Sequence, residues 1–247
     1  MPKLKILLEK KDYAVLLKPA HISVHSDGKT TEETVADIVL DMYPEAEGVG
    51  ESLEVSPGVF VPRHGIVHRL DKDTTGLLIV ARTNEGFDYF KSAFKSRNVK
   101  KTYYAFCHGK PRDERGIIDR AIGRSTESIR KWATGNKIRG EAREARTRYK
   151  IIKSSEGLSF AVLWPETGRT HQIRVHLSSI GHPIVADFLY GGRRVESLGF
   201  TRQALHAGKL TFKDTEGKEV EVEAPFPEDF QKALKKWDLE GFCLIKL

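Results

Sequence analysis

Strand-like segments follow one another along this 247-residue chain, and often no helical segment lies between them. They occupy residues 13–18, 77–82, 101–108, 146–152, 159–164, 205–212 and 219–224. Antiparallel strands need only a turn between them, whereas parallel strands need a long crossover that is usually helical. The sequence therefore predicts an α+β fold with a central, mainly antiparallel mixed β-sheet and flanking helices, rather than a doubly wound α/β fold.

Helical patterns occur in four places. A capping box that starts at Thr30 predicts a helix over about residues 31–43. Asn84 and Thr170 are expected to cap two further helices, and an amphipathic helix lies near the C-terminus. Residues 44–64 are rich in Pro, Gly and acidic side chains, so we expect a loop there.

Basic charge is concentrated in residues 110–150. This segment has thirteen basic and six acidic residues, which accounts for the whole net charge of +7. It also contains several glycines and an isolated Trp132, so it is expected to be loop-rich. Such a segment is either an ordinary solvated surface or a flexible element that follows a chain of phosphates, with the tryptophan stacking on a base.

Length and composition indicate a cytoplasmic protein. A chain of this length is within the range of one domain, and it contains neither an N-terminal signal sequence nor an apolar stretch of 18 residues. Its two cysteines, Cys107 and Cys243, have neither metal-binding nor disulfide spacing. We therefore expect no membrane association and a reducing compartment.

A polar turn at residues 65–76 leads directly into the apolar run at 77–81. His68, Arg69 and Asp71 lie in this turn, so their side chains are placed at the end of a buried strand. Loops held by such strands commonly carry catalytic groups. An isolated Asp in a turn would more simply be a capping residue, so the surrounding motifs decide between the two interpretations.

The sequence His68-Arg69-Leu70-Asp71, followed by Thr74-Thr75-Gly76-Leu77, resembles the signature of the RluA-type pseudouridine synthases. Further motifs similar to those of the family occur in the family's order: Lys18-Pro19 with Val24-His25, Lys101-Thr102-Tyr103-Tyr104-Ala105, Gly168 to His176, Gly181-His182-Pro183 with Asp187, and Leu205-His206-Ala207. Several ordered matches over most of the chain are far more specific than one short motif.

This resemblance implies an enzyme that isomerises specific uridines in ribosomal or transfer RNA to pseudouridine. It also implies a central antiparallel sheet with a catalytic cleft across its middle. Because the first family motif begins near residue 6, we expect residues 1–247 to form a single catalytic domain without a separate N-terminal RNA-binding domain. The expected partner is an RNA stem-loop, and the protein is expected to be a monomer.

In the family the Asp of the signature is the catalytic residue, which indicates Asp71. The isomerisation is neither an oxidation nor a hydrolysis, so no cofactor is required. Asp71 could attack the sugar or the base, or remove the C2′ proton, and the sequence leaves these routes open. A carboxylate enclosed by a stacked base needs a nearby cation to stay ionised, and the family implies that Arg174 provides it. Tyr103 is expected to stack on the uracil, with Tyr104 on the opposite face of its strand.

RNA contacts are expected from two groups of residues. The first group is Arg69, His68, Arg169 and His171, close to the catalytic motifs. Of these, His68 is expected above all to support the turn by a hydrogen bond, and Arg169 and His171 either touch RNA or hold the loops. The second group is Arg130, Lys131 and Trp132 in the basic segment. Extrusion of the target base from structured RNA costs a few kcal/mol, which such contacts must offset. His171 and His176 are five residues apart and no paired Cys-x-x-Cys is present, so we expect no metal site.

Two other function classes remain open. A non-catalytic RNA-binding or ribosome-assembly protein could share this fold, but it would have no chemical reason to retain Asp71, Tyr103 and Arg174 together. A hydrolase of small molecules with an aspartate nucleophile would leave the basic segment without an anionic polymer to bind.

Overall fold

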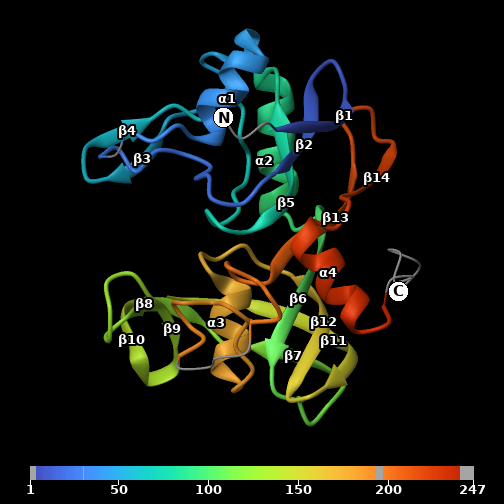
Figure 1. Ribbon diagram of the computed structural model, residues 1–247. Helices are drawn as coiled ribbons and strands as arrows, with labels where there is room; N and C mark the ends of the chain where they lie inside the picture. The colour runs from blue at the N-terminus through green and yellow to red at the C-terminus, as the bar shows by residue number, and fades with distance from the viewer. Residues whose placement is uncertain (1–3, 30, 193–196, 240–247) are drawn as a thin grey trace. The chain divides into compact units, whose positions relative to one another are not determined.

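The computed structural model describes residues 4–29, 31–192 and 197–239 (Figure 1). The chain divides into two compact units. The first unit is Met1–Lys100 with Lys209–Ala224, and the second unit is Lys101–Gly208 with Pro225–Leu247. Strand β13 (Leu205–Lys213) begins in the second unit and ends in the first. The expectation of a single catalytic domain stays a prediction.

In the first unit, strands β1 (Lys5–Glu9), β2 (Tyr13–Lys18) and β5 (Thr75–Ala81) pair in this order and are antiparallel. Successive side chains of a strand point to opposite faces. Alternate residues of β2 and β5 therefore pack against α1 (Val35–Met42) on one face and against α2 (Asn84–Lys95) on the other. Every residue of β5 is buried, so the residues just before it lie at the end of a fixed strand.

Two further hairpins belong to the first unit. Strand β14 (Glu219–Glu223) pairs with the last residues of β13. The expected loop at residues 44–64 contains a 3-10 turn at Pro44–Ala46 and the hairpin of β3 (Leu53–Ser56) and β4 (Val59–Val61). The prediction of a loop there is wrong, because β3 and β4 pair with each other. Gly58, which has a positive φ, turns the chain between these two short strands.

In the second unit, β6 (Lys100–His108), β12 (Leu158–Pro165), β11 (Arg146–Ser155) and β7 (Arg115–Asp119) are neighbours in this order, and each pair is antiparallel. Helix α4 (Glu228–Lys236) packs on this sheet. Aromatic rings from β6, β12 and α4 meet in the core, with ring centroids 4.8 to 5.7 Å apart. Close aromatic contacts of this kind hold a helix at a fixed position on a sheet.

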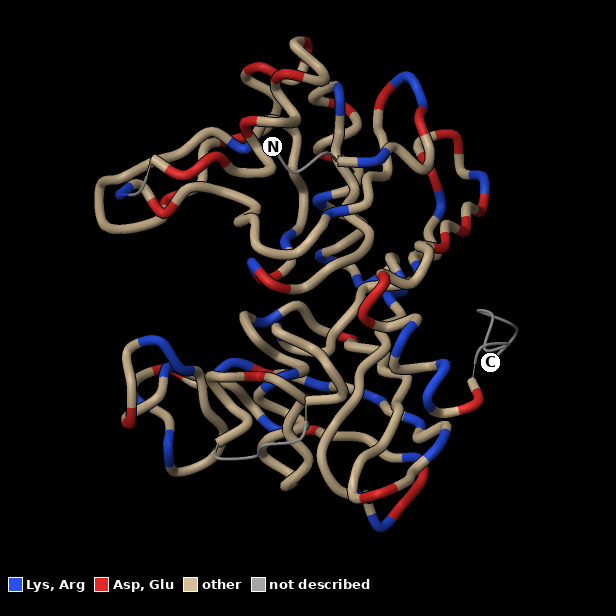
Figure 2. Tube along the Cα trace, viewed as in Figure 1, with Lys and Arg blue, Asp and Glu red and all other residues tan. Residues whose placement is uncertain are grey.

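The basic segment at residues 110–150 is built of strands, so the expectation of a loop-rich segment is wrong. After β7, it forms a small sheet in the order β10 (Ile138–Arg143), β8 (Ile122–Ser125) and β9 (Trp132–Thr134). The strands are three to six residues long, too short for a clear alternating pattern. Figure 2 shows Lys and Arg distributed along this small sheet and its turns.

Helix α1 starts later than the sequence predicts. Its N-cap is Thr34, which forms a capping box with Asp37. The N–H groups of Val35 and of the residue after it bond to backbone carbonyls of the loop after β2, and these contacts fix where the helix begins. The box predicted at Thr30 is therefore wrong, and Thr30 itself lies outside the described residues.

Two other helix N-caps were each predicted one residue away from the observed position: Asn84 is one residue too late and Thr170 one residue too early. Helix α2 is capped by Thr83, while the Asn84 side chain accepts a hydrogen bond from the loop before β3. Helix α3 (Gln172–Ser179) follows His171, whose φ of 54° is left-handed, so Thr170 does not cap it. All seven predicted strands are present, and the α+β class with a central sheet is confirmed. Among the described residues, no helix has the length and apolar character needed to cross a bilayer.

Candidate active site

The polar turn of the first unit is held tightly against β5. Gly65 has a φ of 76°, and a Cβ there would lie 1.8 Å from the carbonyl oxygen of Ala81, so only glycine fits. His68 Nε2 accepts a hydrogen bond of 2.9 Å from the Ile79 N–H, and its ring stacks on Phe94. The prediction that His68 supports the turn by a hydrogen bond is confirmed.

A buried lysine fixes the same turn from the other side. The side chain of Lys18 is fully buried, and its ammonium donates to the carbonyl oxygens of Pro19 at 2.7 Å and Lys72 at 2.9 Å. The Thr74 N–H bonds to the carbonyl of Asp71, which closes the turn. The backbone carbonyls of Asp71 and Lys72 are therefore both held by hydrogen bonds. The sequence placed Lys18 in a motif but gave it no role.

The charged side chains of this turn differ in exposure. Arg69 is exposed and Asp71 is half-buried, so both can meet a ligand. Asp73 is bonded to His21, with 2.9 Å between the carboxylate oxygen and Nδ1. Asp73 therefore helps to hold the loop through its contact with His21. Asp71 comes directly after the buried Leu70.

In the second unit, Arg174 forms a buried ion pair with Asp187. Its Nε and Nη2 donate to the two carboxylate oxygens at 2.7 and 2.9 Å, and the two side chains are 8% and 0% exposed. One oxygen of Asp187 also accepts the N–H groups of Leu189 and Tyr190. The Arg174 guanidinium lies 5.1 Å from the centre of the Tyr190 ring. A bidentate pair of this kind fixes the plane of the guanidinium.

Helix α3, which carries Arg174, is held to β11 by two polar side chains. The Gln172 amide nitrogen donates to the Arg146 carbonyl and to the Thr147 hydroxyl, and His176 Nδ1 bonds to the same hydroxyl. His176 Nε2 bonds to the carbonyl of Arg120 at 3.0 Å. Burial lowers the pKa of His176, which favours the neutral ring.

Tyr103 and Tyr104 lie on opposite faces of β6, as their adjacent positions predict. Tyr104 is buried among the rings of Phe160 and Phe226, whereas Tyr103 is half-buried. Tyr104 is thus a core residue. Tyr103 keeps a partly exposed ring, which a stacking role requires.

The three residues expected to be catalytic divide between the two units. Asp71 belongs to the first unit, and Tyr103 and Arg174 belong to the second. The expected pair between Arg174 and Asp71 therefore stays a prediction. The sequence did not predict that Asp187 is the partner of Arg174. Asp187 was identified only as part of a motif, because no local pattern indicates a contact with a residue thirteen positions earlier.

The residues expected to bind RNA include several that also hold the fold. Arg169 Nε donates to the carbonyl of Glu144 at 3.0 Å. The Tyr190 hydroxyl bonds both to His171 Nδ1 and to the backbone N–H of Trp132, each at 2.9 Å. Arg130 is exposed, and Lys131 and Trp132 are half-buried.

The model of the RNA pseudouridylate synthase family matches residues 12–179 of this chain. This range contains Asp71, Tyr103 and Arg174 and covers more than half of the sequence. The chain therefore belongs to the RNA pseudouridylate synthase family, whose members are enzymes.

Individual relatives agree with this family. The chain is 35% identical over 240 residues to ribosomal large subunit pseudouridine synthase D of Zymomonas mobilis, and this match covers 94% of this chain and 72% of the relative. It is 37% identical over 256 residues to the protein of the same name from Vibrio parahaemolyticus, covering 98% and 73%. The solved structure of human RNA pseudouridylate synthase domain containing 1 has a TM-score of 0.71 and 27% identity, and the match covers 92% of this chain and 84% of that chain. The expected pseudouridine synthase fold is thus confirmed.

Proposed function

We propose that this protein isomerises specific uridines of ribosomal or transfer RNA to pseudouridine, with Asp71 as the catalytic carboxylate. The reaction breaks the bond between C1′ and N1, turns the uracil and joins C1′ to C5, while a proton leaves C5 and N1 gains one. The observation that carries the proposal is the family match across residues 12–179, which contains the whole signature turn. Support also comes from the hydrogen bonds that hold the backbone carbonyls of Asp71 and Lys72.

Two routes are compatible with a carboxylate in this position. Asp71 either attacks carbon covalently, at C1′ of the ribose or C6 of the base, or takes the C2′ proton to give a glycal. In both routes the carboxylate must be ionised when the base is bound. Arg174 meets this need in the proposal by pairing with Asp71, and Asp187 holds its guanidinium in one plane. Tyr103 stacks on the uracil, and its hydroxyl takes part in removing the C5 proton.

RNA binding in this proposal has two parts. Arg69, His68, Arg169 and His171 contact the RNA around the flipped nucleotide, where Arg69 contacts its phosphate or fills the space that the base leaves. The small basic sheet contacts the backbone further away, through Arg130, Lys131 and Trp132. The protein acts as a cytoplasmic monomer on a stem-loop.

The test is release of tritium from RNA labelled at C5 of uridine, measured with ribosomal and transfer RNA from cells that lack this protein. Mapping pseudouridines in the same cells identifies the modified position. The proposal predicts tritium release by the wild-type protein and none by Asp71→Asn. RNA binding without any release from either RNA class would instead support the non-catalytic alternative.

A further inference from the structure

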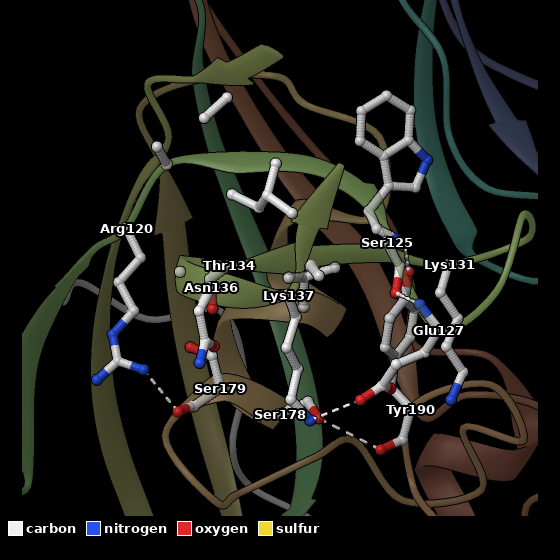
Figure 3. Close-up of a pocket in the computed structure, with 17 residues that line it drawn as sticks. Arg120, Ser125, Glu127, Lys131, Thr134, Asn136, Lys137, Ser178, Ser179 and Tyr190 are labelled. Carbon is white, nitrogen blue, oxygen red and sulfur yellow. Dashed lines mark hydrogen bonds and ion pairs between the residues drawn. The ribbon is translucent and has the colours of Figure 1, made fainter. Parts of the chain in front are cut away.

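A pocket with both polar and apolar walls lies within the second unit, between the small sheet and helix α3 (Figure 3). Its volume is about 810 Å³, and its walls come from β8, β9, η2 (Gly135–Lys137), β10, α3 and Tyr190. We call it the α3 pocket. Cavities of roughly 300–1,000 Å³ bind small molecules of the size of a nucleotide.

The chemistry of the α3 pocket fits an anion joined to a flat ring. Arg120, Lys131 and Lys137 line it together with one acidic residue, Glu127, so the charge of its walls is positive. Glu127 forms an exposed ion pair with Lys137, at 2.8 Å, and such pairs contribute little. Asn136 is exposed at the pocket and offers amide groups to a base edge.

An aromatic side chain completes the set. Trp132 lines the pocket, and the guanidinium of Arg124 lies 4.5 Å from the centre of its ring. Stacked aromatic and arginine groups beside a basic wall are typical of sites that bind single-stranded nucleic acid. Ser178 and Ser179 of α3 add hydroxyl groups to the opposite wall.

The pocket also touches the Arg174 site through one residue. Tyr190 lines the pocket, its hydroxyl bonds to the Trp132 N–H, and its ring faces the Arg174 guanidinium. The α3 pocket therefore lies one side chain away from Arg174, which is proposed to pair with the catalytic carboxylate. An RNA that reaches Arg174 brings neighbouring nucleotides close to this pocket.

We propose that the α3 pocket binds one unpaired nucleotide of the substrate RNA, other than the uridine that reacts. Its phosphate lies between Lys131 and Lys137, and its base stacks on Trp132. Sequence-specific RNA recognition usually involves unstacked bases of loops, which fit a pocket of this kind. The inference rests on the proposed function, because it assumes an RNA substrate.

The structure supplies a matched pair of variants for the test. Lys131 and Lys137 line the pocket, whereas Arg112 and Arg115 of the same basic segment are exposed and do not. The double variants Lys131→Ala/Lys137→Ala and Arg112→Ala/Arg115→Ala each remove two positive charges from residues 110–150. General electrostatic attraction falls equally in both, so any difference reports on the pocket.

Binding is measured by fluorescence anisotropy with labelled hexauridylate and hexaadenylate, which requires no turnover. We expect the pocket variant to bind at least one of them about tenfold more weakly, and the control variant to stay within about threefold of wild type. Equal losses in the two variants would overturn the proposal. Circular dichroism and thermal unfolding check the fold of each variant, and Asn136→Ala provides a milder change in case the pocket variant unfolds.

A second test blocks the pocket without removing charge. Ala142→Trp adds a large side chain at a pocket-lining position, and Ile129→Trp adds one at an exposed position outside it. We expect only Ala142→Trp to raise KM for substrate RNA, by about tenfold. If the wild type forms pseudouridine and both variants have the same KM, the pocket proposal fails while the enzymatic function stands. The wild type could instead form no pseudouridine while the pocket double variant binds the oligonucleotides more weakly than the control. In that case the pocket proposal stands and the proposed enzymatic function fails.

Discussion

The two units fix their proposed catalytic groups in different ways. In the first unit, the turn around Asp71 is held through its backbone, by Lys18 and by the hydrogen bond between Thr74 and Asp71. In the second unit, Arg174 is held through its side chain, by the buried carboxylate of Asp187. A change at Asp71 should therefore affect chemistry with little effect on folding, whereas a change at Arg174 should affect both.

The largest expected effect is that of Asp71→Asn on turnover. The amide keeps the shape of the side chain but neither attacks carbon nor accepts a proton, so the rate should fall by at least about 10⁴-fold. Tritium release under single-turnover conditions measures this loss, and urea unfolding should show nearly unchanged stability. Substantial release by the variant would refute the assignment of Asp71.

Arg174→Ala should reduce turnover by about 10³-fold, because a proposed partner of the catalytic carboxylate is lost. It should also lower the free energy of unfolding by about 3–5 kcal/mol, since Asp187 would remain buried without its cation. Turnover at saturating RNA and urea unfolding measure the two effects. Arg174→Lys is the matched control, because it keeps the charge but not the bidentate geometry. Near wild-type turnover of Arg174→Ala at pH 7 would contradict the proposed pairing with Asp71.

Lys18→Met tests how the first unit holds its turn. The variant keeps most of the side chain's volume but leaves the partly buried carbonyl oxygens of Pro19 and Lys72 without their charged donor, at a cost of about 1–3 kcal/mol. The turn around Asp71 should loosen, so turnover should fall by about tenfold. Unfolding in urea and tritium release are the measurements, and the exposed Lys11→Met is the control. Equal behaviour of the two variants would show that Lys18 does not position Asp71.

The stability of the first unit should depend on pH through His25. Burial, and then the charges of Arg69 and Arg63, lower the pKa of His25 from 6.5 to about 4. The unfolded chain therefore binds more protons than the folded chain between these values, so the free energy of unfolding falls as pH falls from 6.5 to 4. The loss should be about 3 kcal/mol at most. Urea unfolding at several pH values measures it, and His25→Asn should remove most of the slope. If the free energy of unfolding of His25→Asn kept the same slope against pH, the pH dependence would come from other groups, such as His176 of the second unit.

The smallest effect concerns the basic sheet of the second unit. Joint replacement of Arg130, Lys131, Lys137 and Arg139 by Ala should raise KM for long RNA and leave turnover at saturation nearly unchanged. Each lost phosphate contact should reduce the slope of log K against log salt by about 0.7 to 0.9. Trp132→Ala should weaken binding without changing this slope, because stacking is not ionic. An unchanged slope and KM after the fourfold replacement would make the small sheet an ordinary solvated surface.

Local sequence patterns were sufficient to predict the long strands and the candidate catalytic residues. A strand such as β5 is fully buried, and its run of branched apolar residues indicates a strand without knowledge of its neighbours. The small sheet was missed for the opposite reason. Its strands have few apolar residues, so their structure depends on pairing with each other, which a local pattern does not contain.

The sequence by itself determined the α+β class, the family and the candidates Asp71, Tyr103 and Arg174, because each follows from short motifs and local periodicity. Only the tertiary structure decided which groups hold them. Lys18 reaches a carbonyl 54 residues away, and Arg174 pairs with a carboxylate 13 residues away across a helix end and a loop. The α3 pocket likewise combines the small sheet with α3 and Tyr190. Such contacts arise because burial leaves a charged or polar group only the partners that the folded chain places beside it.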